Sequence, residues 1–381
     1  MNPSEHLPEP ILIARPAALE RLTRLLRQSP VIAVDTESNS LYAYQEQVCL
    51  IQFSTPEYDY LVDPLALLDL TSLAPIFSDP KIKKVFHAAE YDVICMRRDF
   101  GFEFANIFDT MIAARILGRE EVGLASILES EFGVTLDKRF QRANWGRRPI
   151  SPELMAYAQL DTHYLIPLHE RLQNELNEKS FWPLACEDFQ RITLANSRTV
   201  ENRGEDFWRI NGARDLTPQH AAVLQELCRY RHQAARYANR PLFKIIGDRT
   251  LVAIAERCPS RLNEFYEIPG MTEGQIERHG EELLAAVRRG LQAQPTYPHH
   301  NRRPEEKFMN RLEALRKWRK STAQKMSVPS DVVLPRDLMM ILAETNPRDS
   351  GELAKIMQSV PWRLKRFGEQ ILGVLSSAHS A

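Results

Sequence analysis

Two acidic residues, Asp35 and Glu37, stand one position apart in the segment VIAVDTE. The segment is short, apolar and rich in β-branched residues, which predicts a buried central strand. Alternate residues of a strand point to the same face, so both carboxylates face one space at the carboxyl end of that strand. Paired carboxylates repel unless a cation lies between them, and Mg²⁺ and Mn²⁺ prefer oxygen ligands. An isolated Asp-x-Glu is more often a turn cap beside a solvated acid.

A further carboxylate, Asp92, ends the segment HAAEYD, which begins at His87 and follows the strand-like IKKVF. A helix that begins near Ala88 would present Asp92 one turn from its start. In the alternative interpretation, Glu90 and Asp92 are ordinary first-turn acids that the helix dipole favours. His87 is expected to form a hydrogen bond near the site rather than to bind a metal.

The last acidic candidate is Asp161, in the segment SPELMAYAQLDTHYL. Ser151 followed by Pro152 predicts a helix start, with serine as the N-cap and proline in the first turn. Tyr157 and Asp161 are then one turn apart on one face of the helix. A carboxylate on this otherwise apolar helix is costly to bury unless it is paired or binds a metal. The alternative is a half-exposed Tyr–Asp pair that only stabilises the helix.

Taken together, in this order and on these elements, the motifs resemble those of the DEDD exonuclease superfamily, in its tyrosine-bearing branch. The segments HAAEYDVICMRRDFGFEFANIFDT, GVTLDKRFQRANWGRRP and YAQLDTHYL resemble consecutive blocks of the ribonuclease D family and of the related eukaryotic exosome-associated exonuclease. This resemblance covers roughly residues 25–175. It implies 3′–5′ exonuclease activity and a ribonuclease H-like mixed sheet with flanking helices.

The resemblance also implies a role for each residue of the site. Two divalent cations, Mg²⁺ or Mn²⁺, would clamp the scissile phosphate. Asp35 would bridge them, Glu37 and Asp161 would complete the site on the nucleophile side, and Asp92 would hold the leaving-group side. Tyr157 would position the attacking water. The products would be nucleoside 5′-monophosphates.

A basic and aromatic segment, LDKRFQRANWGRRP, precedes the helix of Tyr157. Positive charge interleaved with aromatic rings suits a single nucleic-acid strand, through phosphate contacts and base stacking. The alternative is a solvated basic loop. With two residues from elsewhere in the domain, the predicted RNA contacts are Gln52, His87, Lys138, Arg139, Phe140, Arg142, Trp145, Arg147 and Arg148.

Strand-like and helix-like segments alternate through the first half of the chain and must position these residues. Helical periodicity over residues 16–28 leads into the strand 31–37, and residues 47–55 and 58–64 predict a hairpin. A helix at 70–79, a strand at 81–88, a helix at 90–101 and a strand at 104–110 follow, and the pattern is then helical to about residue 195. Such alternation predicts an α/β domain with helices covering a mixed sheet.

The second half is almost entirely helical and contains an internal repeat. Residues 224–287 align without a gap to residues 312–375, at a constant offset of 88. Both copies resemble the HRDC domain, a small helical module, and the second copy has diverged further. The predicted domains are residues 1–204 for the exonuclease domain, 205–292 for the first HRDC domain, 293–304 for a linker and 305–381 for the second, HRDC-like domain.

Charge is distributed unevenly between the two halves. Residues 1–204 carry 21 Lys and Arg against 29 Asp and Glu, and residues 205–381 carry 28 against 21. An acidic metal-using domain joined to a basic polyanion-binding module would produce this pattern. We therefore expect the HRDC modules to hold structured RNA, although basic clusters on helices are usually solvated faces.

Composition excludes several other classes of protein. No apolar run approaches the length of a membrane span, and the N-terminus lacks a signal-peptide pattern, so the expected location is the cytoplasm. Five scattered cysteines without a CxxC pair argue against a disulfide framework and a thiolate zinc site. No obligate protein partner is inferred.

The sequence thus predicts a 3′–5′ exoribonuclease that trims RNA with a free 3′ end, with tRNA precursors as the substrate implied by the resemblance. Two other interpretations remain open at this point. One is a 3′–5′ DNA exonuclease, because Werner-type helicase proteins also combine this nuclease with an HRDC domain. The other is an RNA-binding scaffold without nuclease activity, against which the four carboxylates and Tyr157 argue.

Overall fold

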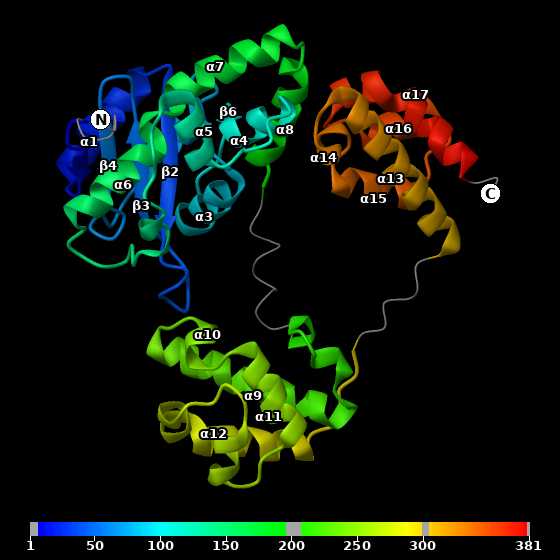
Figure 1. Ribbon diagram of the computed structural model, residues 1–381. Coiled ribbons are helices and arrows are strands. Elements are labelled where there is room, and N and C mark those ends of the chain that lie inside the picture. Colours follow the sequence, from blue (N-terminus) through cyan, green and yellow to red (C-terminus); the bar gives the residue numbers. More distant parts are fainter. Residues whose placement is uncertain (1–6, 196–206, 299–304, 379–381) are drawn as a thin grey trace. The chain divides into compact units, whose positions relative to one another are not determined.

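The computed structural model describes residues 7–195, 207–298 and 305–378 (Figure 1). The chain divides into two compact units. One unit is formed by residues 1–37, 48–196 and 302–381, and the other by residues 38–47 and 197–301. Among the described residues, no helix is both long and apolar enough to cross a membrane.

A six-stranded mixed sheet forms the centre of the first unit, in the order β1-β4-β3-β2-β5-β6. The pair β3–β4 is antiparallel, and β1–β4, β2–β5 and β5–β6 are parallel. The strands are β1 (Ile11–Ile13), β2 (Val31–Ser38), β3 (Val48–Ser54), β4 (Asp59–Val62), β5 (Lys83–Phe86) and β6 (Ile107–Asp109). The predicted strand at residues 31–37 and the predicted hairpin are confirmed, and the short edge strand β1 was not predicted.

Helices cover both faces of this sheet. On one face, Ile32, Val34, Ile51 and Phe53 pack in one core with residues of α1, α2 and α3. On the opposite face, Ala33 packs with residues of α4, α7 and α8, and Leu50 packs with residues of α6. The helices are α1 (Pro16–Gln28), α2 (Ala74–Ser78), α3 (Glu90–Phe100), α4 (Thr110–Ile116), α5 (Leu124–Phe132), α6 (Pro152–His163), α7 (Leu165–Glu178) and α8 (Trp182–Thr193).

Two copies of one helical arrangement make up the rest of the chain. The first copy contains α9 (Pro218–Ala238), α10 (Leu242–Ile245), α11 (Asp248–Arg257) and α12 (Glu273–Gln292). The second contains α13 (Glu306–Met326), α14 (Ser330–Val333), α15 (Arg336–Thr345), α16 (Ser350–Ile356) and α17 (Pro361–Ser377). Helices α13, α14 and α15 begin and end 88 residues after α9, α10 and α11, so the repeat read from the sequence is confirmed.

The two copies start their last long helix differently. In α12, Thr272 and Gln275 form a capping box, with each side chain bonded to the other residue's backbone N–H. Helix α17 has Val360 at the equivalent position, without a side-chain cap. Instead, the carboxylate of Glu187 in α8 accepts hydrogen bonds from the backbone N–H groups of Trp362 and Arg363. The second copy therefore takes its helix cap from the exonuclease part of the chain.

Parts of the predicted domain boundaries lie outside the described residues. The boundary between residues 204 and 205 falls within 196–206, and residues 299–304 of the predicted linker are likewise outside. These boundaries stay predictions.

Candidate active site

Three carboxylates from two elements meet beside the sheet. Strand β2 carries Asp35 and Glu37, helix α6 carries Asp161, and one ligand oxygen of each lies within 4.8 Å of the others. The side chain of Ser151 caps α6 by accepting from the backbone N–H of Leu154 at 3.3 Å, and Pro152 occupies the first turn. The helix start predicted at Ser151 and Pro152 is therefore confirmed.

The fourth carboxylate, Asp92, reaches the cluster through α3. This helix begins at Glu90, as the predicted helix over residues 90–101 does, and Ala88 just before it has a left-handed backbone with φ of 64°. The carboxylate of Asp109 holds the turn by accepting from the backbone N–H groups of Ala88 at 3.2 Å and Ala89 at 2.8 Å. Asp92 is buried in the first turn of α3.

A hydroxyl on β2 ties Asp92 to the other acids. Thr36, which lies between Asp35 and Glu37, donates a hydrogen bond to Asp92. Neither Thr36 nor Asp109 was singled out in the sequence, although Asp109 at the end of a strand and before a helix has the pattern of an N-cap. Both residues position acids rather than add new ones.

Burial and mutual repulsion shift the titration of the whole cluster. Burial first, and then the charges of Asp92, Asp161 and Glu37, hold the pKa of Asp35 well above its usual range. Burial and neighbouring acids likewise raise the pKa of Glu37 to about 9 and that of Asp161 to about 8, and burial raises that of Asp92 to about 7. No Lys or Arg among the described residues forms an ion pair with these carboxylates. An oxygen-only ligand set without an internal counter-charge fits a hard divalent cation.

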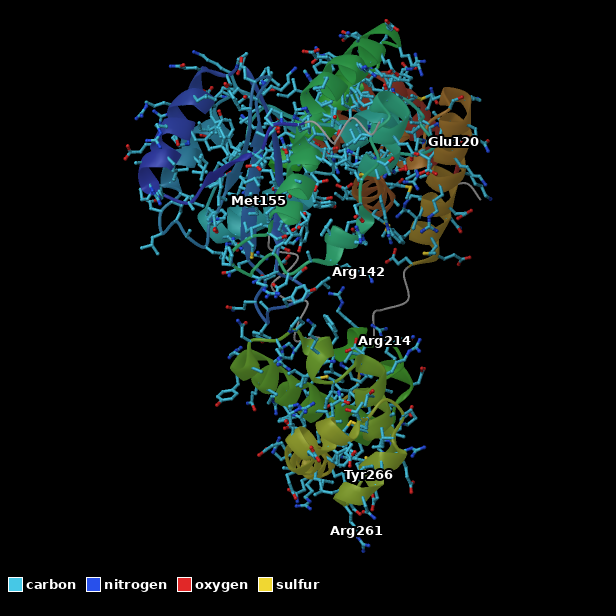
Figure 2. The ribbon with its side chains drawn as sticks, turned by 60° about the vertical axis from the view of Figure 1, so that its left-hand side comes forward. Glu120, Arg142, Met155, Arg214, Arg261 and Tyr266 are labelled. Carbon is cyan, nitrogen blue, oxygen red and sulfur yellow. The ribbon has the colours of Figure 1, made fainter. Side chains whose placement is uncertain are left out.

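Tyr157 lies one turn before Asp161 and is buried. Its ring centroid is 5.7 Å from that of Phe140 and 6.2 Å from that of Trp145. Burial and then the neighbouring acids, Asp161 first, hold the pKa of the Tyr157 hydroxyl well above its usual range, so it stays protonated. Tyr157, Phe140 and Met155 line a cleft of about 620 Å³. Figure 2 shows Met155 on α6 and Arg142 in the segment that precedes it.

Two of the residues predicted to contact RNA lie in the core, and a third forms an ion pair. Gln52 is fully buried, and Trp145 is 2% exposed and packs with Tyr157, so neither side chain has a surface for RNA. Arg148 donates to both carboxylate oxygens of Asp63 at 2.7 Å and to the backbone oxygen of Cys49 at 2.7 Å. We therefore correct the prediction for Gln52 and Trp145, and the prediction for Arg148, whose side chain is 27% exposed, stays a prediction. The segment mixes core and surface residues, which its composition does not reveal.

The other predicted RNA contacts stay predictions. Arg139 is exposed and pairs with Asp137, Phe140 is half-buried, and Arg142 and Arg147 are exposed. The side chain of Lys138 lies outside the described part of the chain. His87 lies 2.9 Å from the hydroxyl of Thr110 through its Nδ1 atom, and burial lowers its pKa to about 4.

Comparison with known protein families agrees with this arrangement. Residues 10–177 match a family described as 3′–5′ exonuclease, and residues 220–287 and 308–375 both match the HRDC domain. The mixed sheet, its covering helices and the buried acids therefore define a 3′–5′ exonuclease fold followed by two HRDC domains.

Ribonuclease D of Escherichia coli is 33% identical over 278 residues, which are 72% of this chain and 73% of that protein. The chain therefore belongs to the ribonuclease D family. The crystal structure of the E. coli enzyme covers 97% of this chain and 99% of its own, with a TM-score of 0.72 and 28% identity. Ribonuclease D of Pseudomonas paraeruginosa is 27% identical over 97% of this chain and 99% of that protein.

Longer proteins share only part of their length with this chain. Protein RRP6-like 3 of Arabidopsis thaliana is 34% identical over 278 residues, which are 65% of this chain but 31% of that protein. The chain spans 31% to 45% of the length of the RRP6-like proteins that it matches.

Proposed function

We propose that this chain hydrolyses RNA from a free 3′ end and releases nucleoside 5′-monophosphates, with two divalent cations, Mg²⁺ or Mn²⁺, in the acid cluster. The observation that carries the proposal is the convergence of Asp35, Glu37 and Asp161 within 4.8 Å, with Asp92 buried beside them. Family membership supplies the reaction class, and this cluster supplies the ligands for it.

The ligand set divides between the two cations as the resemblance implies. Asp35 would be shared, Glu37 and Asp161 would serve the cation on the nucleophile side, and Asp92 the one on the leaving-group side. When bound, such cations neutralise charge on the scissile phosphate and lower the pKa of water.

The chain itself provides positioning at this site. The protonated hydroxyl of Tyr157, one turn from Asp161, can hydrogen-bond the attacking water and fix its line of approach to phosphorus. Hydrolysis breaks the bond between phosphorus and the 3′-oxygen of the penultimate nucleotide. The terminal nucleotide leaves as a 5′-monophosphate, and the shortened strand keeps a free 3′-hydroxyl.

For the substrate, we propose 3′-extended tRNA precursors and other structured RNAs. The related E. coli enzyme is described as an exoribonuclease involved in structured RNA processing. Two HRDC domains in a net-basic half of the chain support an RNA-binding role. A cytoplasmic location and action without an obligate protein partner are part of the same proposal.

The experiment compares a 3′-extended tRNA with a DNA strand that has the same sequence and a frayed 3′ end. Each is incubated with the full-length protein and either Mg²⁺, Mn²⁺ or EDTA, and products are sized. We expect mononucleotide release from RNA that depends on the cation. Faster cleavage of DNA would make the protein a DNA exonuclease, and no release at high protein concentration would make it a binding scaffold.

A further inference from the structure

Asp59, the first residue of β4, is a buried acid outside the acid cluster of the candidate active site. Its Oδ2 atom accepts a hydrogen bond at 2.6 Å from the side-chain amide of Gln159. Nδ1 of His163 lies 2.9 Å from the same oxygen and donates to it, because a carboxylate oxygen only accepts. Both partners belong to α6, the helix that carries Tyr157 and Asp161. One carboxylate of the sheet therefore holds two residues of α6 that are one turn apart.

Two stripes of residues run along α6 on nearly opposite sides. Gln159 and His163, which Asp59 holds, form one stripe. Tyr157 and Asp161 form the other, which lies about 160° away around the helix at about 100° per residue. The hydrogen bonds to Asp59 therefore restrain the side of α6 that is turned away from the active site.

The side of α6 between these stripes rests on the sheet. Thr162 accepts a hydrogen bond from Ser54 of β3 at 2.7 Å, and Ala158 packs in one core with Leu50 of the same strand. In the sheet, β3 lies between β4 and β2. Helix α6 thus lies over β3, with Asp59 on its β4 side and the active-site acids of β2 on its other side.

A roll of α6 about its own axis would misplace the active-site side chains that it carries. The rim of a helix lies about 5–6 Å from its axis, so a roll of about 10° displaces the groups there by about 1 Å. A misplacement of about 1 Å can reduce a catalysed rate by about 100-fold. The two hydrogen bonds of Asp59 oppose such a roll, because they are short and directional.

We propose that Asp59 is a positioning residue of the active site, which sets the roll of α6 and so aims Tyr157 and Asp161 at the acids of β2. The proposal rests on the proposed function, because Tyr157 and Asp161 act in that reaction. Asp59 acts through Gln159 and His163 rather than on the reacting groups. This role requires a hydrogen-bond acceptor and does not require a charge.

The test replaces Asp59 by alanine, which removes both hydrogen bonds, and by asparagine, which keeps the shape and one acceptor oxygen. Nucleotide release by the full-length protein is measured against RNA concentration, at a temperature where the variants are folded. We expect Asp59→Ala to lower kcat by about 100-fold at a nearly unchanged KM, because the misplaced groups act in the transition state. Asp59→Asn should recover most of that loss.

A second measurement does not depend on turnover. Mn²⁺ binding to the full-length protein is followed by calorimetry. Asp59→Ala should weaken it by about 10-fold, the lower end of the effect of residues that hold metal ligands in place. Thr23→Val is the matched control, because it removes a buried hydroxyl that donates to the backbone oxygen of Leu19 in α1, on the opposite face of the sheet. It should lower the Tm and leave both kcat and the Mn²⁺ affinity unchanged.

The outcomes separate the positioning role from the proposed function. A folded Asp59→Ala protein with the kcat and Mn²⁺ affinity of the wild type overturns the positioning role, and so does an equal loss of activity in Asp59→Asn. If Asp59→Ala does not fold, Gln159→Met removes the shorter hydrogen bond and should lower kcat by a smaller factor. An unchanged kcat in that variant also contradicts the role. A wild-type protein that neither binds Mn²⁺ nor degrades RNA overturns the proposed function itself.

Discussion

Two groups of acids in the same compact unit, each buried or half-buried, differ in whether a basic side chain of the chain neutralises them. In the candidate active site, the carboxylates of Asp35 and Asp161 converge without a basic side chain among the described residues to pair with them. In α8, Glu187 is buried too, but Arg363 of α17 lies against it with 2.9 Å between Nη1 and Oε2. The same guanidinium pairs with Asp188 at 2.8 Å.

The difference shows how to tell a functional acid cluster from a structural one. Arg363 is fully buried, and its guanidinium also donates to the backbone oxygen of Val332, so this charge is neutralised within the chain. Burial, and then repulsion from the neighbouring acids, raises the pKa values of Asp35 and Glu37, whereas at Glu187 burial raises the pKa and the charge of Arg363 opposes that rise. A buried acid that pairs with a basic side chain of the same chain links two elements of the structure. A buried acid cluster that has no such basic side chain needs a cation from solution.

The largest effect is expected from substitutions of the active-site acids. Asp35→Asn, or Asp161→Asn, should reduce exonuclease activity by about a thousandfold or more, since a metal contributes several kcal/mol to the transition state. Folding and RNA binding should persist. Activity is measured as nucleotide release with excess Mn²⁺, and binding by gel shift on the same RNA. A variant with near-normal rates would remove these residues from the metal site.

The substitution Arg363→Ala tests the buried ion pair between α8 and α17. Removing the cation leaves the buried carboxylate of Glu187 without a counter-charge, which should destabilise the unit by about 3–5 kcal/mol. Urea unfolding followed by tryptophan fluorescence measures the loss, and Arg366→Ala, an exposed arginine on the same helix, is the control. Equal urea midpoints for the two variants would show that the buried ion pair does not stabilise the unit.

The pH dependence of stability tests whether the active-site acids lack a counter-charge. The acids of the active site have folded-state pKa values raised above their unfolded values, up to about 9 for Glu37. The stability that protonation of these acids contributes is therefore fully present below a pH of about 4 and is lost as the pH rises toward 9. In EDTA, the Tm should fall between pH 6 and 9, less steeply for Asp35→Asn, and Mn²⁺ should oppose the fall. A Tm slope that Asp35→Asn leaves unchanged would contradict this account.

The smallest expected effect concerns the cap that each helical copy uses. Thr272→Ala removes the side-chain cap of α12 and should cost about 0.5–2 kcal/mol, confined to the compact unit that contains α12. The matching Val360→Ala in α17 removes no side-chain cap, because Glu187 fills that role. Native-state hydrogen exchange resolves the two copies. Loss of protection in α17, rather than α12, after Thr272→Ala would contradict the assignment.

Much of the fold could be predicted because its signals are local. Periodicity and capping residues predicted the helix over 16–28 and the start of α6 at Pro152, and the repeat predicted two equivalent helical copies. The strand β1 spans only three residues and has no pattern of its own. All seven residues of β3 are buried, so alternation could not show that Gln52 points inward.

The residues of the candidate site likewise differ in whether the sequence could identify them. The four acids and Tyr157 could be identified from the sequence because they occur in short motifs whose order along the chain matches a known family. The contributions of Thr36 and Asp109 depend on contacts between segments that are distant in sequence. Arg363 and Glu187 are 176 residues apart, so no local pattern could have paired them.

The cap supplied by Glu187 bears on how this chain can be divided and reused. The first helical copy carries its own Thr272 cap, so the start of α12 needs no side chain from the exonuclease part of the chain. The second copy begins α17 with Val360 and Pro361 and depends on a carboxylate encoded far upstream. Gene truncation before residue 305 would leave Glu187 and Asp188 without their counter-ion, whereas an exchange of the two copies would place Gln275 where Arg363 is required. For protein engineering, the two repeats are therefore alike in shape but not interchangeable as parts.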